Sequence, residues 1–193
     1  MSITQLLQDW FNENQRILPF RQDKDPYRVW ISEIMAQQTQ IDSMIPYYQR
    51  WMTRWPNLRS LSEADENELL KMWEGLGYYT RVRNIHKAAL ALKDKHYIFP
   101  NELDEIRALP GIGAYTAAAI ASICFETKAV AIDGNVYRVV SRLFEFSDEQ
   151  GSKAREKKVT ETLARWMESA TPSVFTQAMM ELGALICTPK NPQ

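Results

Sequence analysis

The segment Leu109-Pro110-Gly111-Ile112-Gly113-Ala114-Tyr115-Thr116 is the most specific local pattern in this 193-residue sequence. A proline and two closely spaced glycines predict a tight turn between two helices, the first from about Glu102 and the second to about Phe125. Such a turn leaves backbone N–H groups pointing outward at the start of the second helix, an arrangement that binds a phosphate. An ordinary connection between two helices, without a ligand, is the alternative.

The sequence on both sides of this turn is also typical of helices. The chain has only seven glycines, about half of the usual share of roughly 7%, and its β-branched residues form no alternating runs. Caps such as Asp25-Pro26 and breaks such as Gly75-Leu76-Gly77 set the boundaries. The sequence therefore predicts an all-α fold, with further helices at residues 26–37, 43–54, 62–73, 80–95, 133–143, 152–169 and 173–187.

Composition limits the class of protein. With 45% hydrophobic and 24% charged residues, the chain fits one or two compact domains with a real core. It has no apolar run of roughly 18 residues and no basic, apolar leader, so we expect no membrane association and a cytoplasmic location. Two cysteines without paired spacing, Cys124 and Cys187, and two histidines predict neither a disulfide framework nor a zinc site.

With a net charge of −1, the chain has no general positive field to attract a nucleic acid, which argues against such a partner. A turn that binds phosphate through backbone amides does not need a basic surface, however. The glycine-containing turn above is also the pattern of a helix-hairpin-helix DNA-binding hairpin, so DNA remains a candidate partner.

Two carboxylates are candidates for chemistry. Asp133 follows an apolar run and begins a helix, although helix capping alone would explain an aspartate there. Glu33 shares a helical face with Val29, Trp30 and Gln37, and desolvation on such a face should raise its pKa and make it a proton donor. The alternative is a partly exposed glutamate at the edge of the apolar stripe.

Two further segments suit contact with a duplex. Tyr78 and Tyr79 lie on a glycine-flanked break, with Arg81 and Arg83 just beyond, and exposed aromatic rings near cations suit base stacking or insertion. Core packing of at least one tyrosine is the alternative. The amides of Gln37-Gln38-Thr39 could replace lost base-pair hydrogen bonds, or could simply form a polar helix end.

Together and in this order, these segments resemble the helix-hairpin-helix glycosylases of base excision repair, and more closely the MutY-type adenine DNA glycosylases. The resemblance runs from about Leu6 to the last residue, through the blocks 18–21, 25–40, 73–87, 109–116, 132–143 and 177–187. It implies two helical subdomains with the active site in the cleft between them. We expect residues 1–25 and 126–193 in one subdomain and 26–125 in the other, with the helix-hairpin-helix at about 102–125.

The resemblance also implies roles for single residues. Glu33 matches the general acid that protonates nitrogen 7 of adenine, and Asp133 matches the carboxylate that supports the sugar cation. Tyr115 and Asn135 match residues that position that carboxylate. The remaining expected contacts with substrate or DNA are Arg21 and Glu181 at the extruded adenine, Gln38 and Tyr78 near the lesion and the opposite base, Gly111 and Gly113 in the hairpin, and Arg81 and Arg83 at phosphates.

The implied activity is hydrolysis of the glycosidic bond of a flipped-out adenine mispaired with 8-oxoguanine or guanine. Endonuclease III-type relatives form a Schiff base through a lysine at the position of Tyr115, so tyrosine predicts a monofunctional enzyme. The expected partner is double-stranded DNA, bound by a monomer in the cytoplasm, on the nucleoid if the source is bacterial. A thymine-removing or endonuclease III-like enzyme and a catalytically silent DNA-binding module are the alternatives.

The sequence departs from this family at its end. The family carries a [4Fe–4S] cluster on four cysteines, of which Cys187 matches the first, and the next is expected just beyond the last residue. We therefore expect no cofactor on this chain, either because the family's cluster segment is truncated or because the protein is a cluster-free relative. We also expect the family's carboxy-terminal domain, which reads 8-oxoguanine, to be missing, and Phe20 and Ala36 replace an expected tryptophan and leucine.

Overall fold

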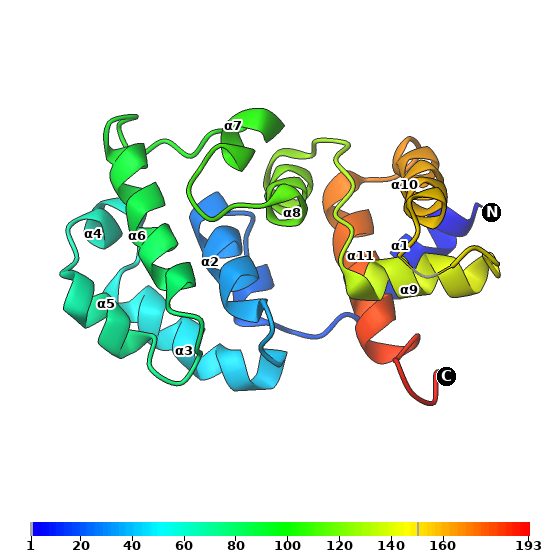
Figure 1. The fold of residues 1–193 in the computed structure, drawn as a ribbon, viewed down its shortest axis with the longest axis horizontal. Coiled ribbons are helices and arrows are strands. Elements are labelled where there is room, and N and C mark those ends of the chain that lie inside the picture. The colour runs from blue at the N-terminus through cyan, green and yellow to red at the C-terminus, as the bar shows by residue number, and fades with distance from the viewer. Residues whose placement is uncertain (1, 150) are drawn as a thin grey trace. The chain divides into compact units, whose positions relative to one another are not determined.

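The computed structural model describes residues 2–149 and 151–193, and the regular elements of these residues are all helices (Figure 1). The predicted all-α fold is therefore confirmed. In chain order the elements are α1 (Ile3–Asn14), the 3-10 helix η1 (Pro19–Arg21), α2 (Pro26–Ala36), α3 (Ile41–Arg54), α4 (Leu58–Ser62), α5 (Glu66–Met72), α6 (Thr80–Lys93), α7 (Leu103–Arg107), α8 (Ala114–Phe125), α9 (Gly134–Leu143), α10 (Lys153–Met167) and α11 (Pro172–Leu185).

The chain forms two compact units. Unit 1 comprises Met1–Arg16 and Ala121–Gln193, and unit 2 comprises Ile17–Ile120. The sequence-based division was at residues 25 and 126, whereas the structure groups residues 17–25 with unit 2. One reason is that the Phe20 ring packs edge-on against Tyr48 of α3, with 5.6 Å between ring centroids.

Unit 2 is built around buried aromatic side chains. Trp51 lies between Trp55 and Trp73, with ring centroids 4.8 and 5.7 Å away. The Tyr27 hydroxyl donates to the carbonyl of Trp55 at 2.6 Å and accepts from Trp51 Nε1 at 3.1 Å, which ties the start of α2 to α3. These contacts hold α2 rigidly at its amino-terminal end, which is capped by Asp25.

Unit 1 has a separate aliphatic core. Its buried members come from α9, α10 and α11, and they are Val136, Val139, Val140, Val159, Leu163, Met167, Phe175 and Met179. Helix α1 packs on α11 in the same unit (Figure 1). Where α9 and α11 approach most closely, a Cβ added at Gly183 would lie 2.8 Å from the Cβ of Asn135, so only glycine fits there.

Two helical predictions needed correction. Within the expected helix over 62–73, only residues 66–72 are helical as α5, because Asp65 caps α5, whereas Ser62 ends the separate helix α4 that begins after the capping box of Asn57. No helix was expected before residue 26, but Ser2 caps α1, whose buried face includes the polar residues Thr4 and Gln8. None of the helices described is long and apolar enough to cross a membrane.

Candidate active site

The hairpin between α7 and α8 has the geometry that the sequence predicts. Gly111 adopts φ +78°, and a Cβ there would lie 2.6 Å from the Cβ of Asn84 on α6. Gly113 has open space around it instead, and its carbonyl accepts the first helical bond from Ala117 at 2.9 Å. Because the first amides of α8 have no acceptor within the helix and Gly113 and Ala114 are exposed, this helix start can receive a phosphate.

Glu33 lies on α2 among buried side chains. Val29 and Trp30, one turn earlier, are buried, as are the following Ile34 and Met35, whereas Glu33 itself is half-buried. The residue therefore lies at the margin of an apolar face. One turn later, Gln37 Nε2 lies 3.4 Å from Thr116 Oγ1, which joins the end of α2 to the first turn of α8.

Tyr115 is the second residue of α8 and is half-buried. Its neighbour Thr116 is the one that contacts Gln37, so Tyr115 lies on the turn of helix that is joined to the end of α2. Arg21 ends η1 and is also half-buried. The roles expected of them, positioning of the Asp133 carboxylate by Tyr115 and contact with the base by Arg21, stay predictions.

Gln38 and Tyr78 share an unusual feature. Both are exposed, Tyr78 to 67%, and both adopt left-handed backbone conformations, with φ +57° and +48°. Such a conformation costs a non-glycine residue about 1 kcal/mol or more, and strained residues tend to cluster at functional sites. The expected alternative for the tyrosine pair, packing in the core, does not hold for Tyr78.

Arg81 has a different role from the predicted one. Its two terminal nitrogens donate to backbone carbonyls of two separate segments, and burial lowers the pKa of its guanidinium. The guanidinium is directed into the protein and not toward a phosphate. Arg83 is half-exposed and pairs with Glu66 at 3.3 Å, so it remains a candidate for a phosphate contact.

Asp133 is held in a fixed direction at the start of α9. Its Oδ1 accepts from the backbone N–H of Val136 at 2.7 Å, and its Oδ2 accepts from the side-chain amide of Asn135 at 3.0 Å. The predicted N-cap is thereby confirmed. Asp133 also borders a cavity of about 490 Å³ in unit 1, lined by Ile132, Gly134, Tyr137, Gly151, Glu156 and Thr160.

Glu181 was expected to contact an extruded adenine, but the structure gives it an internal partner. It is fully buried on α11, and Arg16 donates to it from Nε at 2.7 Å, from Nη2 at 2.9 Å and from its backbone amide at 3.0 Å. This pair fixes the end of α1 to α11. Gly183, two residues after Glu181 on α11, packs against Asn135. The ion pair therefore fixes α11 close to the point where it contacts Asn135.

A [4Fe–4S] cluster does not fit the residues present. It needs four thiolates, whereas Cys124 and Cys187 are the two cysteines, and residues 2–149 and 151–193 contain no group of three acidic, histidine or cysteine side chains suited to a metal. The Cys187 carbonyl accepts from Arg138 at 2.9 Å, and its sulfur lies 3.5 Å from Arg142.

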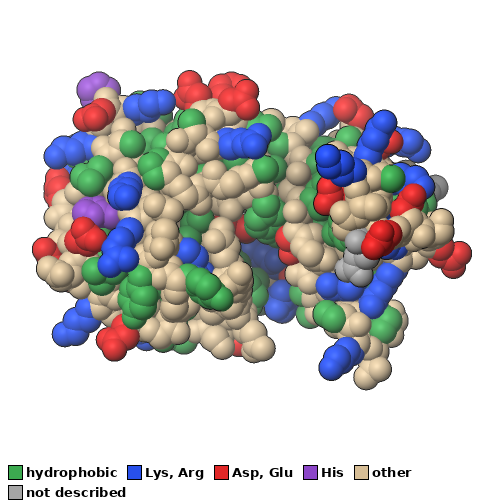
Figure 2. Space-filling model, in the orientation of Figure 1, with side chains coloured by type: hydrophobic (Ala, Val, Ile, Leu, Met, Phe, Trp, Pro, Cys, Tyr) green, Lys and Arg blue, Asp and Glu red, His purple; other side chains and the backbone are tan. Residues whose placement is uncertain are grey.

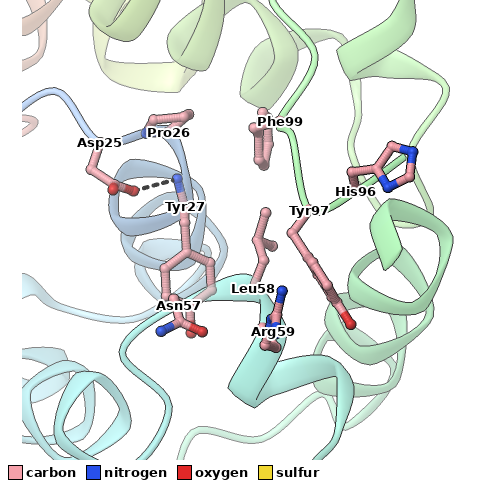
Figure 3. A pocket seen from close by; sticks show the side chains of 9 residues that line it. All are labelled: Asp25, Pro26, Tyr27, Asn57, Leu58, Arg59, His96, Tyr97 and Phe99. Carbon is pink, nitrogen blue, oxygen red and sulfur yellow. Dashed lines mark hydrogen bonds between the residues drawn. The ribbon is translucent and has the colours of Figure 1, made fainter. Parts of the chain in front are cut away.

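A second cavity lies in unit 2, away from every predicted site residue. It measures about 360 Å³ and is lined by the starts of α2 and α4 and by the residues after α6 (Figure 3). There the guanidinium of Arg59 stacks 5.0 Å from the ring centre of Tyr97, while Asp25 bonds its own helix at Tyr27. These polar groups are used within the protein, so the cavity does not enter the proposed activity.

Basic and acidic residues are nearly equal in number in this chain. On the face shown in Figure 2, basic and acidic side chains are interspersed, with no large patch of one sign. The 23 basic and 24 acidic residues therefore give little long-range attraction for DNA. Recognition of a duplex would have to rely on specific contacts such as the hairpin amides.

Comparison with known proteins places this geometry in a family. Residues 31–168 match the HhH-GPD superfamily of base excision DNA repair proteins. The chain belongs to that superfamily. The match includes Glu33, the hairpin and Asp133, and it covers the larger part of the chain.

Individual members of the HhH-GPD superfamily are also similar. The chain is 42% identical to the adenine DNA glycosylase of Buchnera aphidicola subsp. Baizongia pistaciae over 98% of this chain and 54% of that protein, so it spans about half of that relative. It is 37% identical to the human adenine DNA glycosylase over 96% of this chain and 36% of that protein. A solved thermostable thymine-DNA glycosylase has a TM-score of 0.87 and 25% identity, covering 98% of this chain and 88% of that one.

Three residues that support the candidate site residues were not predicted from the sequence. Arg16 holds Glu181, Gly183 allows α11 to approach Asn135, and Asn84 packs against Gly111. Only Gly183 left a trace in the sequence, because a glycine inside an apolar helix often marks a close approach. The other two act through contacts between segments that are distant in the sequence.

Proposed function

We propose that this chain is a DNA N-glycosylase that removes adenine mispaired with 8-oxoguanine or guanine in base excision repair. The observation that carries the proposal is the Asp133 carboxylate, oriented by the Val136 amide and by Asn135. It is supported by membership of a base excision superfamily and by relatives named adenine DNA glycosylases. The expected partner is double-stranded DNA, bound by a monomeric enzyme in the cytoplasm, on the nucleoid if the source is bacterial.

Asp133 would act on the sugar. As the glycosidic bond breaks, C1′ develops positive charge, and a carboxylate fixed in advance stabilises that charge without reorganising. Stabilisation can be electrostatic or through a short-lived ester, as in glycoside hydrolysis. Water then adds to C1′ and gives up a proton, which leaves an abasic sugar.

Glu33 would act on the base. It donates its proton to nitrogen 7 of adenine, so the electron pair of the broken bond leaves on a neutral base instead of an anion. Its place at the margin of a buried face suits a group that must meet an extruded base while largely shielded from water. Arg21 is the further candidate for contact with that base, whereas Tyr115 and Asn135 are the candidates for positioning Asp133.

The hairpin would hold the DNA backbone. Gly111 and Gly113 leave the amides at the start of α8 open to a phosphate, and Arg83 can supply one of few charged contacts. Gln38 and Tyr78 are exposed and would enter the duplex beside the extruded adenine. Tyr115 in place of a lysine supports a monofunctional enzyme, which leaves the strand intact.

A single-turnover assay tests the proposal. Duplexes carrying adenine opposite 8-oxoguanine, guanine or cytosine, and thymine opposite guanine, are incubated with excess protein, and the free base is identified by chromatography. We expect adenine release, fastest opposite 8-oxoguanine and guanine, and no trapping of the protein on DNA by borohydride. Release of thymine, which the likeness to a thymine-DNA glycosylase structure makes the second candidate, or release of no base at all, would overturn it.

A further inference from the structure

The contacts of Arg81 are concentrated on two segments, the end of α2 and the loop between α5 and α6. Arg81 lies on the first turn of α6. Its Nη1 donates to the carbonyls of Ile34 at 2.9 Å, Met35 at 3.4 Å and Gln37 at 2.6 Å. Its Nη2 donates to the carbonyls of Leu76 at 2.8 Å and Gly77 at 3.3 Å. One side chain therefore joins the carboxyl end of α2 to the loop between α5 and α6.

Two of the bonded carbonyls stand directly before exposed residues with a left-handed backbone conformation. Gln37 precedes Gln38, and Gly77 precedes Tyr78. The last carbonyls of a helix lack partners within it, so a cation that binds them fixes where the chain leaves α2. Arg81 thus binds the carbonyl of the peptide bond that precedes each of these two residues, and so fixes the backbone of both.

Aromatic side chains complete the arrangement. The Arg81 guanidinium lies 5.3 Å from the centre of the Trp73 ring and 5.6 Å from that of Tyr78. Trp73 is fully buried, and its Nε1 donates to the carbonyl of Gly77 at 3.0 Å, the same carbonyl that Arg81 binds. The loop that carries Tyr78 is therefore fastened from the core as well as from α6.

We propose that Arg81 is a positioning residue that locks the backbones of Gln38 and Tyr78 to one another, so that their side chains enter a duplex as one preformed unit. The proposal rests on the proposed function, because it takes the duplex as the ligand. Ordering two segments before binding removes an entropic cost from the step that opens the base pair. A lysine cannot replace the arginine, since one ammonium has three donors and no planar fork to reach two segments.

The test compares Arg81→Lys and Arg81→Met with the control Arg54→Met. Arg54 is also bound through two nitrogens, at 2.6 and 2.9 Å, but to the exposed carboxylate of Glu68 and to no backbone carbonyl. Single-turnover adenine release is measured opposite guanine and opposite an abasic site. A defect in folding slows both reactions equally, whereas a defect in opening the duplex slows mainly the first.

We expect both Arg81 variants to lose about 10²-fold in rate opposite guanine, as small misplacements of positioned groups do. Opposite the abasic site we expect a loss of about tenfold or less, because extrusion costs least for an unpaired base. The Arg54 variant should match the wild type on both substrates. Wild-type rates in the Arg81 variants, or equal losses on the two substrates, would overturn the proposal.

A second readout separates this proposal from the proposed function. The fluorescence of 2-aminopurine beside the target adenine reports insertion into the duplex whether or not a bond is cleaved. We expect the wild type and Arg54→Met to change this fluorescence and the Arg81 variants to change it much less. An unaltered response in the Arg81 variants overturns the positioning role, whereas a wild type that inserts but releases no adenine overturns the function alone.

Discussion

At the scale of single residues, Gly111 is the position where the hairpin tolerates least change. Its left-handed φ and its contact with Asn84 both exclude a side chain. We expect Gly111→Ala to lower the free energy of unfolding by about 2 kcal/mol and to weaken duplex binding. At Gly113 an added Cβ meets nothing within 4 Å, so Gly113→Ala should change the free energy of unfolding by less than about 0.5 kcal/mol. Urea denaturation of both variants checks this, and equal effects would show that the turn does not depend on Gly111.

Glu181 and Arg16 give a second prediction for single residues. Arg16→Met leaves the fully buried Glu181 carboxylate without the arginine that binds both its oxygens. We expect the free energy of unfolding to fall by about 3 kcal/mol, with part of the loss recovered when Glu181→Gln is added. Thermal and urea unfolding of the two variants measure this. A loss below about 1 kcal/mol in Arg16→Met would mean that the ion pair with Glu181 contributes little to the stability of unit 1.

How far single residues could be predicted depended on the range of the interaction. Asp133 and Asn135 are two positions apart, so a local cap pattern anticipated their geometry. The positive φ of Gln38 and the inward path of Arg81 depend on contacts over more than 40 positions, with no local signal. Arginines near tyrosines indicate DNA contact only when their guanidinium groups are not already used by the fold.

At the scale of elements, the packing of α2 against α3 makes the stability of the fold depend on pH in the alkaline range. Burial raises the pKa of Tyr48 on α3 to about 12, and burial also raises the pKa of Tyr27 on α2. Because the unfolded phenol ionises near pH 10, the unfolded chain releases these protons first. Their contribution to stability is complete below about pH 10 and is lost as the pH rises toward 12.

Tyr48→Phe isolates part of this effect. The Tyr48 hydroxyl is buried and has no hydrogen-bond partner among the described residues, so at pH 7 we expect the variant to unfold within about 1 kcal/mol of the wild type. Between pH 10 and 12 its stability should fall less steeply. Denaturation midpoints across this range measure the slopes. Identical slopes would indicate that Tyr48 does not stay protonated in the folded protein.

The helices themselves could be predicted where caps and breaks were strong. Asp25-Pro26 and Asp133 marked the starts of α2 and α9 correctly. Helix α1 was missed because its buried face includes Thr4 and Gln8, and burial of Gln8 depends on its bond to the Thr171 amide at 2.8 Å. A polar residue that finds its partner in a distant helix breaks the apolar periodicity on which such predictions rest.

At the scale of the whole molecule, charge limits how DNA can be bound. Net charge is −1, and Arg81 is used within the protein. Each phosphate neutralised by a basic side chain adds roughly 0.9 to the slope of log affinity against log salt, and we expect about two to four such contacts. Titrations of a mispaired duplex from low to high salt should give a slope below about 4. A slope above about 6 would contradict this number of phosphate contacts.

In the proposed reaction, one carboxylic acid and one oriented carboxylate together remove adenine. Single-turnover adenine release and duplex affinity, measured in Asp133→Asn, Glu33→Gln and the wild type, test these two roles. Both changes keep the shape of the side chain and remove either the anion or the proton. We predict that each variant loses at least about 10³-fold in rate and keeps its affinity for the duplex within about threefold, since neither carboxylate is assigned to phosphate binding. Near-normal adenine release by either variant would contradict the account.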